Sequence, residues 1–311
     1  ASITPTINQL FVLGGILQNA RVLNGGADID RAERKFVYGR HGGKPVGVIS
    51  QKESDPKRLI REFLAIVGRE LAMYLNSNNI PALYRVQAAP DESAVADFRN
   101  KAEALGIDLS GVSGFDVFSY AAECSHGTRS EELLLKALHA SLKETGFAAQ
   151  PMRHVVHGTY MYVRFAYPMN RFADYCIQRI VKAIIAAREQ GTPINRELMA
   201  EKVEMAIEAA NVLEKRASRI ESKVEDIVAM ECLRKIGQRS YTGLVSGVNE
   251  KEIEVLLDNG CVGYIDLAQR SYAEYKDGTV TTGGQVYSFG SDVTVRFDRA
   301  DFRAGKLYLT L

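Results

Sequence analysis

The sequence predicts an α+β protein, with a helix-rich part over residues 1–235 followed by a small all-β part over residues 236–311. In the first part, apolar residues recur at the three- and four-residue spacing of amphipathic helices. In the second part, short runs of β-branched and aromatic residues alternate with glycine-containing turns. This change of pattern divides the chain into two expected domains.

The composition is that of an ordinary globular protein, with 46% hydrophobic residues, 25% charged residues and a formal net charge of +1. Any contact with nucleic acid must therefore come from local basic patches rather than from the overall charge. No apolar run approaches the roughly 18 residues of a membrane span, so we expect no membrane partner.

The four cysteines lie far apart in the sequence, and no C-x-x-C pair occurs. The spacing therefore supports neither a zinc ribbon nor a redox motif. A reducing compartment suits such cysteines. We expect an intracellular location, either cytoplasmic or in an organellar matrix, and mitochondrial if a transit peptide has been removed.

Helical periodicity accounts for most of the first part. A helix with a glycine interruption is expected over residues 6–23. Two strands within residues 35–50, joined by a turn at 41–43, follow it. Pro56 suits the first turn of the next helix. Further along, the pattern predicts an extended segment over 80–86, helices over 91–105, 130–143 and 195–235, and a loop with a short helical piece over 110–130.

The all-β part reads as five short strands with glycine-marked turns, with a polar loop before the fourth strand. This number and length of strands fit a small OB-type barrel, a fold that binds single-stranded nucleic acid on its second and third strands. Tyr264 lies on the third strand and Arg296 on the fourth. Either side chain could face RNA, although about half of the residues in a barrel strand face the core.

An aromatic and basic stretch at residues 162–179 reads Y-V-R-F-A-Y-P-M-N-R-F-A-D-Y-C-I-Q-R. It predicts a loop that leads into an apolar helix over 176–187, with Asn170, Arg171 and Asp174 grouped at the junction. Free backbone amides and positive charge at a helix N-terminus suit a phosphate group. The alternative is a capped helix with an ordinary ion pair between Arg171 and Asp174.

Three stretches, in this order along the chain, resemble the ribonuclease II / ribonuclease R (RNB) family of 3′-to-5′ exoribonucleases. Residues 59–68 are similar to the family's I-V-E-E-F-M-L-L-A-N, and residues 80–86 to its P-A-L-Y-R-x-H-x-x-P. The aromatic stretch is similar to the family's Y-T-H-F-T-S-P-I-R-R-Y-A-D-x-x-x-H-R. The residues that match it are Tyr162, Phe165, Pro168, Arg171, Ala173, Asp174 and Arg179. The resemblance implies the carboxyl-terminal part of an RNB-type α/β catalytic domain followed by an OB-type barrel.

The sequence also departs from the family pattern. The family holds Mg²⁺ through aspartates in a D-x-x-x-x-x-D-x-D-D run, which is absent here, and the nearest acidic pair is Asp28 and Asp30. Asn170 stands where the family has a phosphate-contacting arginine, and Arg61 and Gly68 replace a glutamate and an asparagine of the helix motif. The departures predict no catalytic or metal-binding residues, and no cofactor unless an amino-terminal half supplies the aspartates for magnesium.

Single-stranded RNA is the partner that the resemblance implies. The residues expected to contact RNA have polar, cationic or aromatic side chains, except for the acidic Asp174, which is included because it matches the family motif. The predicted RNA-binding residues are Arg85, Arg164, Asn170, Arg171, Asp174, Arg179, Tyr264 and Arg296.

Three functional hypotheses follow. The first is a catalytically inactive RNB-like protein that binds RNA and serves as a structural or assembly component of a larger RNA-processing or ribonucleoprotein complex. The second is part of an active Mg²⁺-dependent exoribonuclease whose aspartates lie on a missing or separate amino-terminal half. The third is a helical protein whose barrel serves protein contacts. Because a half-domain exposes apolar surface, we also expect a protein partner that covers it.

Overall fold

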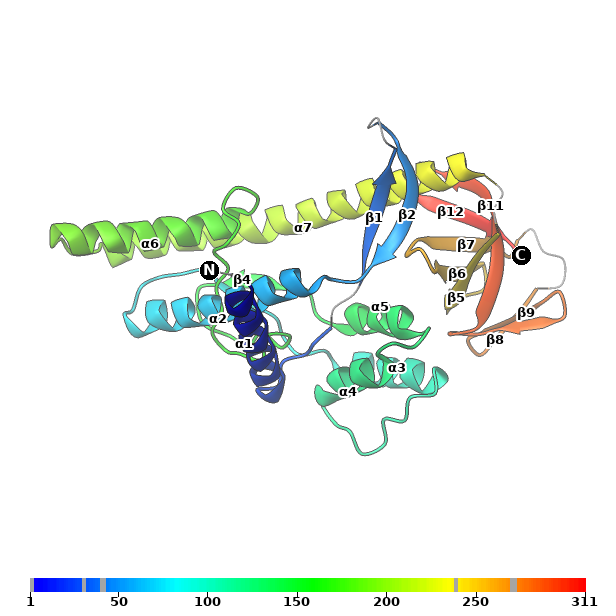
Figure 1. Cartoon of the computed structure of the whole chain (residues 1–311), viewed down its shortest axis with the longest axis horizontal. Coiled ribbons are helices and arrows are strands. Elements are labelled where there is room, and N and C mark those ends of the chain that lie inside the picture. The colour runs from blue at the N-terminus through cyan, green and yellow to red at the C-terminus, as the bar shows by residue number, and fades with distance from the viewer. Residues whose placement is uncertain (1–2, 30–31, 40–42, 238–239, 269–272) are drawn as a thin grey trace.

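The computed structural model describes residues 3–29, 32–39, 43–237, 240–268 and 273–311. A helical body lies at one end and a β-barrel at the other, and the long helix α7 runs along both (Figure 1). The α+β class predicted from the sequence is confirmed. No described helix is long and apolar enough to cross a membrane.

The part of the chain before the barrel carries two two-stranded sheets, β3–β4 in the helical body and β1–β2 beside α7, where Val48 of β2 is buried in the barrel core (Figure 1). Its elements are α1 (Thr4–Leu23), β1 (Glu33–Tyr38), β2 (Pro45–Gln51), α2 (Asp55–Ser77), β3 (Tyr84–Val86), α3 (Glu92–Ala104), α4 (Asp116–Ser125), α5 (Glu131–Ser141), β4 (Gly146–Ala148), α6 (Phe172–Gln190) and α7 (Arg196–Ile236). Most of them agree closely with the predicted ranges, but β4 was not predicted and α6 is longer than the helix expected over residues 176–187. Residues 41 and 42 of the turn expected between β1 and β2 lie outside the described part of the chain.

The barrel consists of β5 (Ser240–Val248), β6 (Glu252–Leu257), β7 (Val262–Asp266), β11 (Asp292–Asp301) and β12 (Lys306–Thr310). It closes in the order β11-β12-β7-β6-β5, as predicted for five strands. Outside the barrel, the segment predicted as a polar loop instead forms a small sheet. Its strands are β8 (Glu274–Lys276), β9 (Thr279–Thr282) and β10 (Gln285–Tyr287). Val280 and Tyr287 of that sheet are buried in the barrel core, and this burial explains the added order.

The helix α7 begins at a cap and ends in the barrel core. The side chain of Asn195 accepts a hydrogen bond of 3.0 Å from the backbone N–H of Leu198, which satisfies one of the free amides of the first turn. At the other end, Met230 and Leu233 pack into the same core as the barrel strands. The division of the chain at residue 235 remains a prediction, and one continuous core joins the end of α7 to the barrel.

The helix α6 begins earlier than the sequence suggested, at Phe172 rather than at residue 176. Ala173 and Ile177 are buried and belong to the core between α2, α6 and α7, so the first turn already contributes to packing. Arg171 is the N-cap residue, but its side chain does not cap the helix. The Arg171 side chain therefore leaves the backbone N–H groups of the first turn uncapped.

Candidate nucleic-acid interface

A groove of about 740 Å³ lies between the start of α6 and the middle of α7. The loop before α6 contributes Asn170 and Arg171, and the first residue of the helix, Phe172, lies beside them. One side of α7 contributes the opposite wall, which includes Glu214 and Arg219. The groove therefore joins the aromatic and basic stretch to a helix that follows it in the chain.

Two exposed cations of this groove are available to a ligand. Arg171 and Arg219 form no ion pair with any residue that the structure describes. The guanidinium of Arg171 lies 5.2 Å from the ring centroid of Tyr167, which orients the side chain without neutralising it. Phe172 is exposed beside them and offers an aromatic face. Free cations next to an aromatic ring suit a phosphodiester chain with stacked bases.

Below the groove, four side chains form a line of alternating charge. Arg85 forms an ion pair with Glu214. Glu214 in turn binds the Nη1 of Arg164 at 2.9 Å, and the Nε of Arg164 lies 3.8 Å from Asp174. Burial lowers the pKa of the Arg85 guanidinium, and Glu214 opposes that effect. The line of charges links β3, the loop before α6 and α7. It therefore holds in place the loop that carries Arg171.

This line changes the interpretation of three predicted RNA contacts. Arg85 is only 8% exposed, and its charge is compensated by Glu214, as is the charge of Arg164. Asp174 is 1% exposed, and its Oδ2 accepts a hydrogen bond of 2.9 Å from the backbone N–H of Tyr167. A buried carboxylate cannot touch RNA, so Asp174 instead holds the loop over the helix. The ion pair between Arg171 and Asp174 that the sequence allowed is not formed.

The other predicted residues lie apart from the groove. Arg179 is exposed on α6 and donates a hydrogen bond of 3.1 Å to the hydroxyl of Tyr175. Tyr264 is half-buried on β7, with the Nζ of Lys306 4.6 Å from its ring centroid. Arg296 is exposed on β11, where its backbone pairs with Thr310. The structure thus brings together Arg85, Arg164, Asn170, Arg171 and Asp174, but not these three.

Sequence reasoning missed the contribution of α7. Glu214, Lys215 and Arg219 lie about forty residues beyond the loop, in a charged helix whose polar residues we interpreted as a solvated face. Glu214 pairs with two arginines from distant segments, Arg85 of β3 and Arg164 of the loop before α6. No spacing along the chain signals such a pairing.

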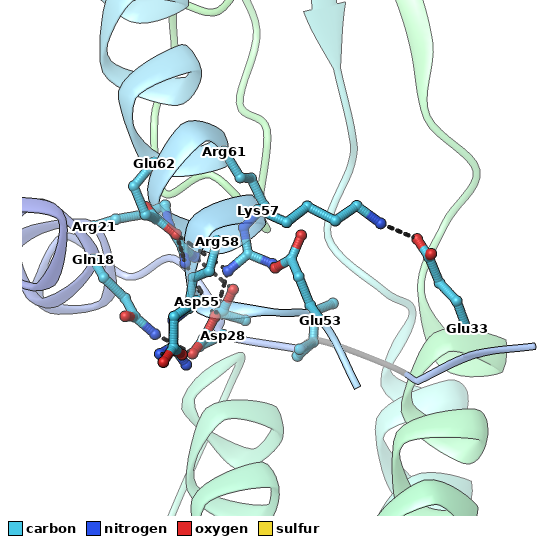
Figure 2. Close-up of polar contacts among 12 residues, drawn as sticks. Gln18, Arg21, Asp28, Glu33, Glu53, Asp55, Lys57, Arg58, Arg61 and Glu62 are labelled. Atoms are coloured by element: carbon cyan, nitrogen blue, oxygen red, sulfur yellow. Dashed lines mark hydrogen bonds and ion pairs between the residues drawn. The ribbon is translucent and has the colours of Figure 1, made fainter. Parts of the chain in front are cut away.

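A second polar cluster joins α1 to α2 (Figure 2). Arg21 donates to the buried carboxylate of Glu62 at 2.7 Å and 2.9 Å and to Asp28 at 3.2 Å. Arg61 also reaches Asp28, at 3.3 Å, and Glu53, at 2.9 Å. The carboxylate of Asp28 is therefore engaged by two guanidinium groups.

This cluster does not suit magnesium, which requires several oxygen ligands in near-octahedral order. Two cations already occupy the carboxylate of Asp28, and Asp30 lies outside the described residues. Within the described part of the chain, no group of three or more histidine, cysteine, aspartate or glutamate side chains could hold a metal ion.

Two histidines, the buried His154 and the half-buried His157, lie between this cluster and the line of charges below the groove. The ring centroids of His154 and His157 are 4.5 Å apart, and His157 also packs on Tyr162 at 4.2 Å. Burial lowers the pKa of His154 to about 2 and that of His157 to about 3, with nearby arginines acting in the same direction. Both rings are therefore neutral at physiological pH, which suits packing beneath the loop.

Comparisons with known proteins identify the family to which the fold belongs. The model of the RNB domain matches residues 1–187. Ribonuclease R of Escherichia coli (strain K12) is 24% identical over 328 residues, covering 100% of this chain and 40% of that protein. Ribonuclease R 2 of Lactococcus lactis is 23% identical over 312 residues, covering 97% of this chain and 46% of that protein. The chain thus spans less than half the length of these relatives.

Solved structures show the same fold. Mycoplasma genitalium RNase R, at 19% identity, superposes with a TM-score of 0.85 over 99% of this chain and 50% of its own. Yeast Ssd1, at 18% identity, has a TM-score of 0.52 over 72% of this chain and 28% of its own. Because the RNB model matches more than half of the residues, from α1 to α6, the chain belongs to the RNB-domain family.

Proposed function

We propose that this chain binds single-stranded RNA in the groove between α6 and α7, does not cut RNA by itself, and acts as a component of a larger RNA-processing or ribonucleoprotein assembly. The observation that carries the RNA site is the placement of Arg171 and Arg219 in one groove beside the exposed ring of Phe172. Mycoplasma genitalium RNase R in complex with ribose methylated single-stranded RNA has a related fold, with a TM-score of 0.86. That likeness supports the choice of ligand.

The proposal that the chain does not cut RNA is supported by the polar cluster around Asp28. Arg21 and Arg61 hold this carboxylate, and a metal ion would have to displace both guanidinium groups before it could bind. Yeast Ssd1, described as a pseudonuclease, is one of the proteins of related fold, so the RNB scaffold has a non-catalytic precedent. The alternative is an active exoribonuclease whose metal-binding aspartates come from another polypeptide segment.

The binding site is tested by reversing a groove charge and, separately, a matched charge outside the groove. Arg219→Glu should lower the affinity for a fluorescein-labelled oligoadenylate several-fold and reduce the salt slope by about 0.7, the value for one single-strand phosphate contact. Arg216 lies on the same helix, is exposed, and does not line the groove. Arg216→Glu makes the same change in net charge and should have a much smaller effect. Equal losses in the two variants would refute the groove as the site.

The labelled RNA also reports on cutting. With Mg²⁺ or Mn²⁺ present, the oligonucleotide should keep its full length on a denaturing gel while it remains bound. Progressive shortening from the 3′ end by the isolated chain would contradict this part of the proposal and favour the exoribonuclease alternative.

A further inference from the structure

One glutamate lies among the cations of the groove between α6 and α7. Glu144 belongs to the segment between α5 and β4, and it lines this groove together with Lys215 and Arg219 of α7. Its Oε2 atom lies 2.7 Å from the Nζ of Lys215, so the two side chains form an ion pair. Lys215 lowers the pKa of the Glu144 carboxyl through a hydrogen bond and its charge, and Arg219 adds a smaller electrostatic contribution in the same direction. The Glu144 carboxylate therefore neutralises positive charge that RNA would otherwise meet.

The backbone on both sides of Glu144 is held in place. The side chain of Gln87 donates a hydrogen bond of 2.9 Å to the carbonyl oxygen of Lys143. The side chain of Asn211 accepts a hydrogen bond of 2.8 Å from the backbone N–H of Phe147 and donates one of 3.1 Å to its carbonyl oxygen. An anchored segment thus presents the Glu144 carboxylate to the groove, and rotation of its own side chain is sufficient to move it away.

The ion pair is easily broken, because both partners are exposed. The side chain of Glu144 is 71% exposed and that of Lys215 is 55% exposed. An ion pair in such a position contributes little to stability, since water screens the attraction and two mobile side chains must be ordered. By contrast, Glu214, which also lines the groove, is held by both Arg85 and Arg164. Of these two glutamates, Glu144 is the one that a ligand can displace.

We propose that Lys215 and Arg219 form a subsite for one phosphate of single-stranded RNA, and that the Glu144 carboxylate occupies this subsite until RNA displaces it. This inference rests on the proposed RNA site in the same groove. A carboxylate and a phosphodiester both present anionic oxygens to ammonium and guanidinium donors, so they compete for the same side chains. Glu144 thereby lowers the affinity of the groove for RNA.

The test compares the affinities of variants for a fluorescein-labelled oligoadenylate at low salt. Glu144→Gln removes the charge and keeps the shape of the side chain, so it should bind the RNA about three- to tenfold more tightly than the wild-type chain. Glu189→Gln is the matched control, because Glu189 is exposed near the end of α6 and does not line the groove. It makes the same change in net charge and should bind nearly as the wild type does. An equal gain in both variants, or no gain in Glu144→Gln, would overturn the proposal.

A double-mutant cycle shows whether the gain comes from this ion pair. In a Lys215→Gln background the ion pair is already removed, so Glu144→Gln should change the affinity by less than about twofold. A gain of the same size in both backgrounds would show that Glu144 acts by general repulsion of RNA, and it would refute displacement from the subsite. Urea denaturation should give nearly the same stability for all these variants, because the pair is exposed.

The outcomes separate this inference from the RNA site itself. If Arg219→Glu weakens binding and Glu144→Gln leaves it unchanged, the groove binds RNA but Glu144 does not occupy a phosphate subsite. If neither variant changes the affinity, the groove is not the RNA site and both conclusions fail.

Discussion

At the scale of single residues, Glu214 is the side chain on which the candidate site depends most. It is the shared partner of Arg85 and Arg164, which come from β3 and from the loop before α6. The sequence identified both arginines, and it identified Asn170 and Arg171 above them. It could not identify Glu214, because an ion pair between distant segments leaves no periodic trace in a helix that is rich in charge.

We predict that Glu214→Gln lowers the free energy of unfolding by about 3 kcal/mol, because it leaves the buried Arg85 without its counter-charge. Urea denaturation measures this change. Glu221→Gln is the control, since Glu221 also lines the groove but forms no ion pair with a described residue. If both variants were equally stable, the line of charges below the groove would have no structural role.

His154 and His157, which lie close to this line of charges, make the stability of the protein depend on pH. Burial lowers their folded-state pKa values to about 2 and about 3, from 6.5. Below pH 6.5 the unfolded chain therefore binds protons that the folded chain does not, so stability falls as the pH falls. Each histidine contributes about 1.4 kcal/mol per pH unit in this window, and the two together up to about 4 kcal/mol between pH 7 and pH 5.

Urea denaturation at pH 7 and pH 5 checks this expectation, with the change between the two pH values as the readout. His157→Asn should make that change smaller by removing one of the two groups. His126 is exposed, so His126→Asn should leave it nearly as in the wild type. A His157→Asn variant with the full pH dependence would show that His157 is not buried as a neutral ring.

At the scale of elements, the contact between α2 and the aromatic stretch decides where the groove lies. Gly68 of α2 accepts a hydrogen bond of 3.3 Å from the backbone N–H of Val163. A Cβ atom at Gly68 would lie 2.5 Å from the carbonyl oxygen of Val163 and 2.6 Å from the ring of Tyr162. The sequence predicted α2 and the loop, and it marked Gly68 as a departure from the family motif. The close approach of the α2 backbone at Gly68 to the loop backbone at Val163 could be seen only in the structure.

We predict that Gly68→Ala destabilises the protein by about 1–2 kcal/mol, despite the better helix propensity of alanine, because the loop must move. It should also weaken oligoadenylate binding, since this loop carries Arg171. Gly15→Ala in α1 is the matched control. Its Cβ meets nothing within 4 Å, so it should stabilise by up to about 1 kcal/mol. Thermal denaturation and RNA titration measure both effects, and a stabilised Gly68→Ala variant would contradict the contact.

At the scale of the whole molecule, the sequence predicted the order of the elements well. The barrel strands follow from alternation and glycine turns, which are local signals. The sheet of β8, β9 and β10 was missed because its strands are short and polar, and it gains order from the packing of Val280 and Tyr287 on the barrel. The residues that line the groove come from distant segments and meet only because α7 runs beside both parts of the molecule (Figure 1). The meeting of these segments depends on the folded chain and cannot be predicted from local sequence patterns.

The central claim is that RNA lies in the groove between α6 and α7, and photocrosslinking tests it most directly. A single-stranded oligonucleotide that contains 4-thiouridine is bound to the wild-type chain, irradiated, and the modified peptides are identified by mass spectrometry. We predict that the adducts fall within residues 164–175 and 210–221, and that Arg171→Glu with Arg219→Glu removes them. Adducts confined to the barrel, within residues 240–311, would contradict the claim.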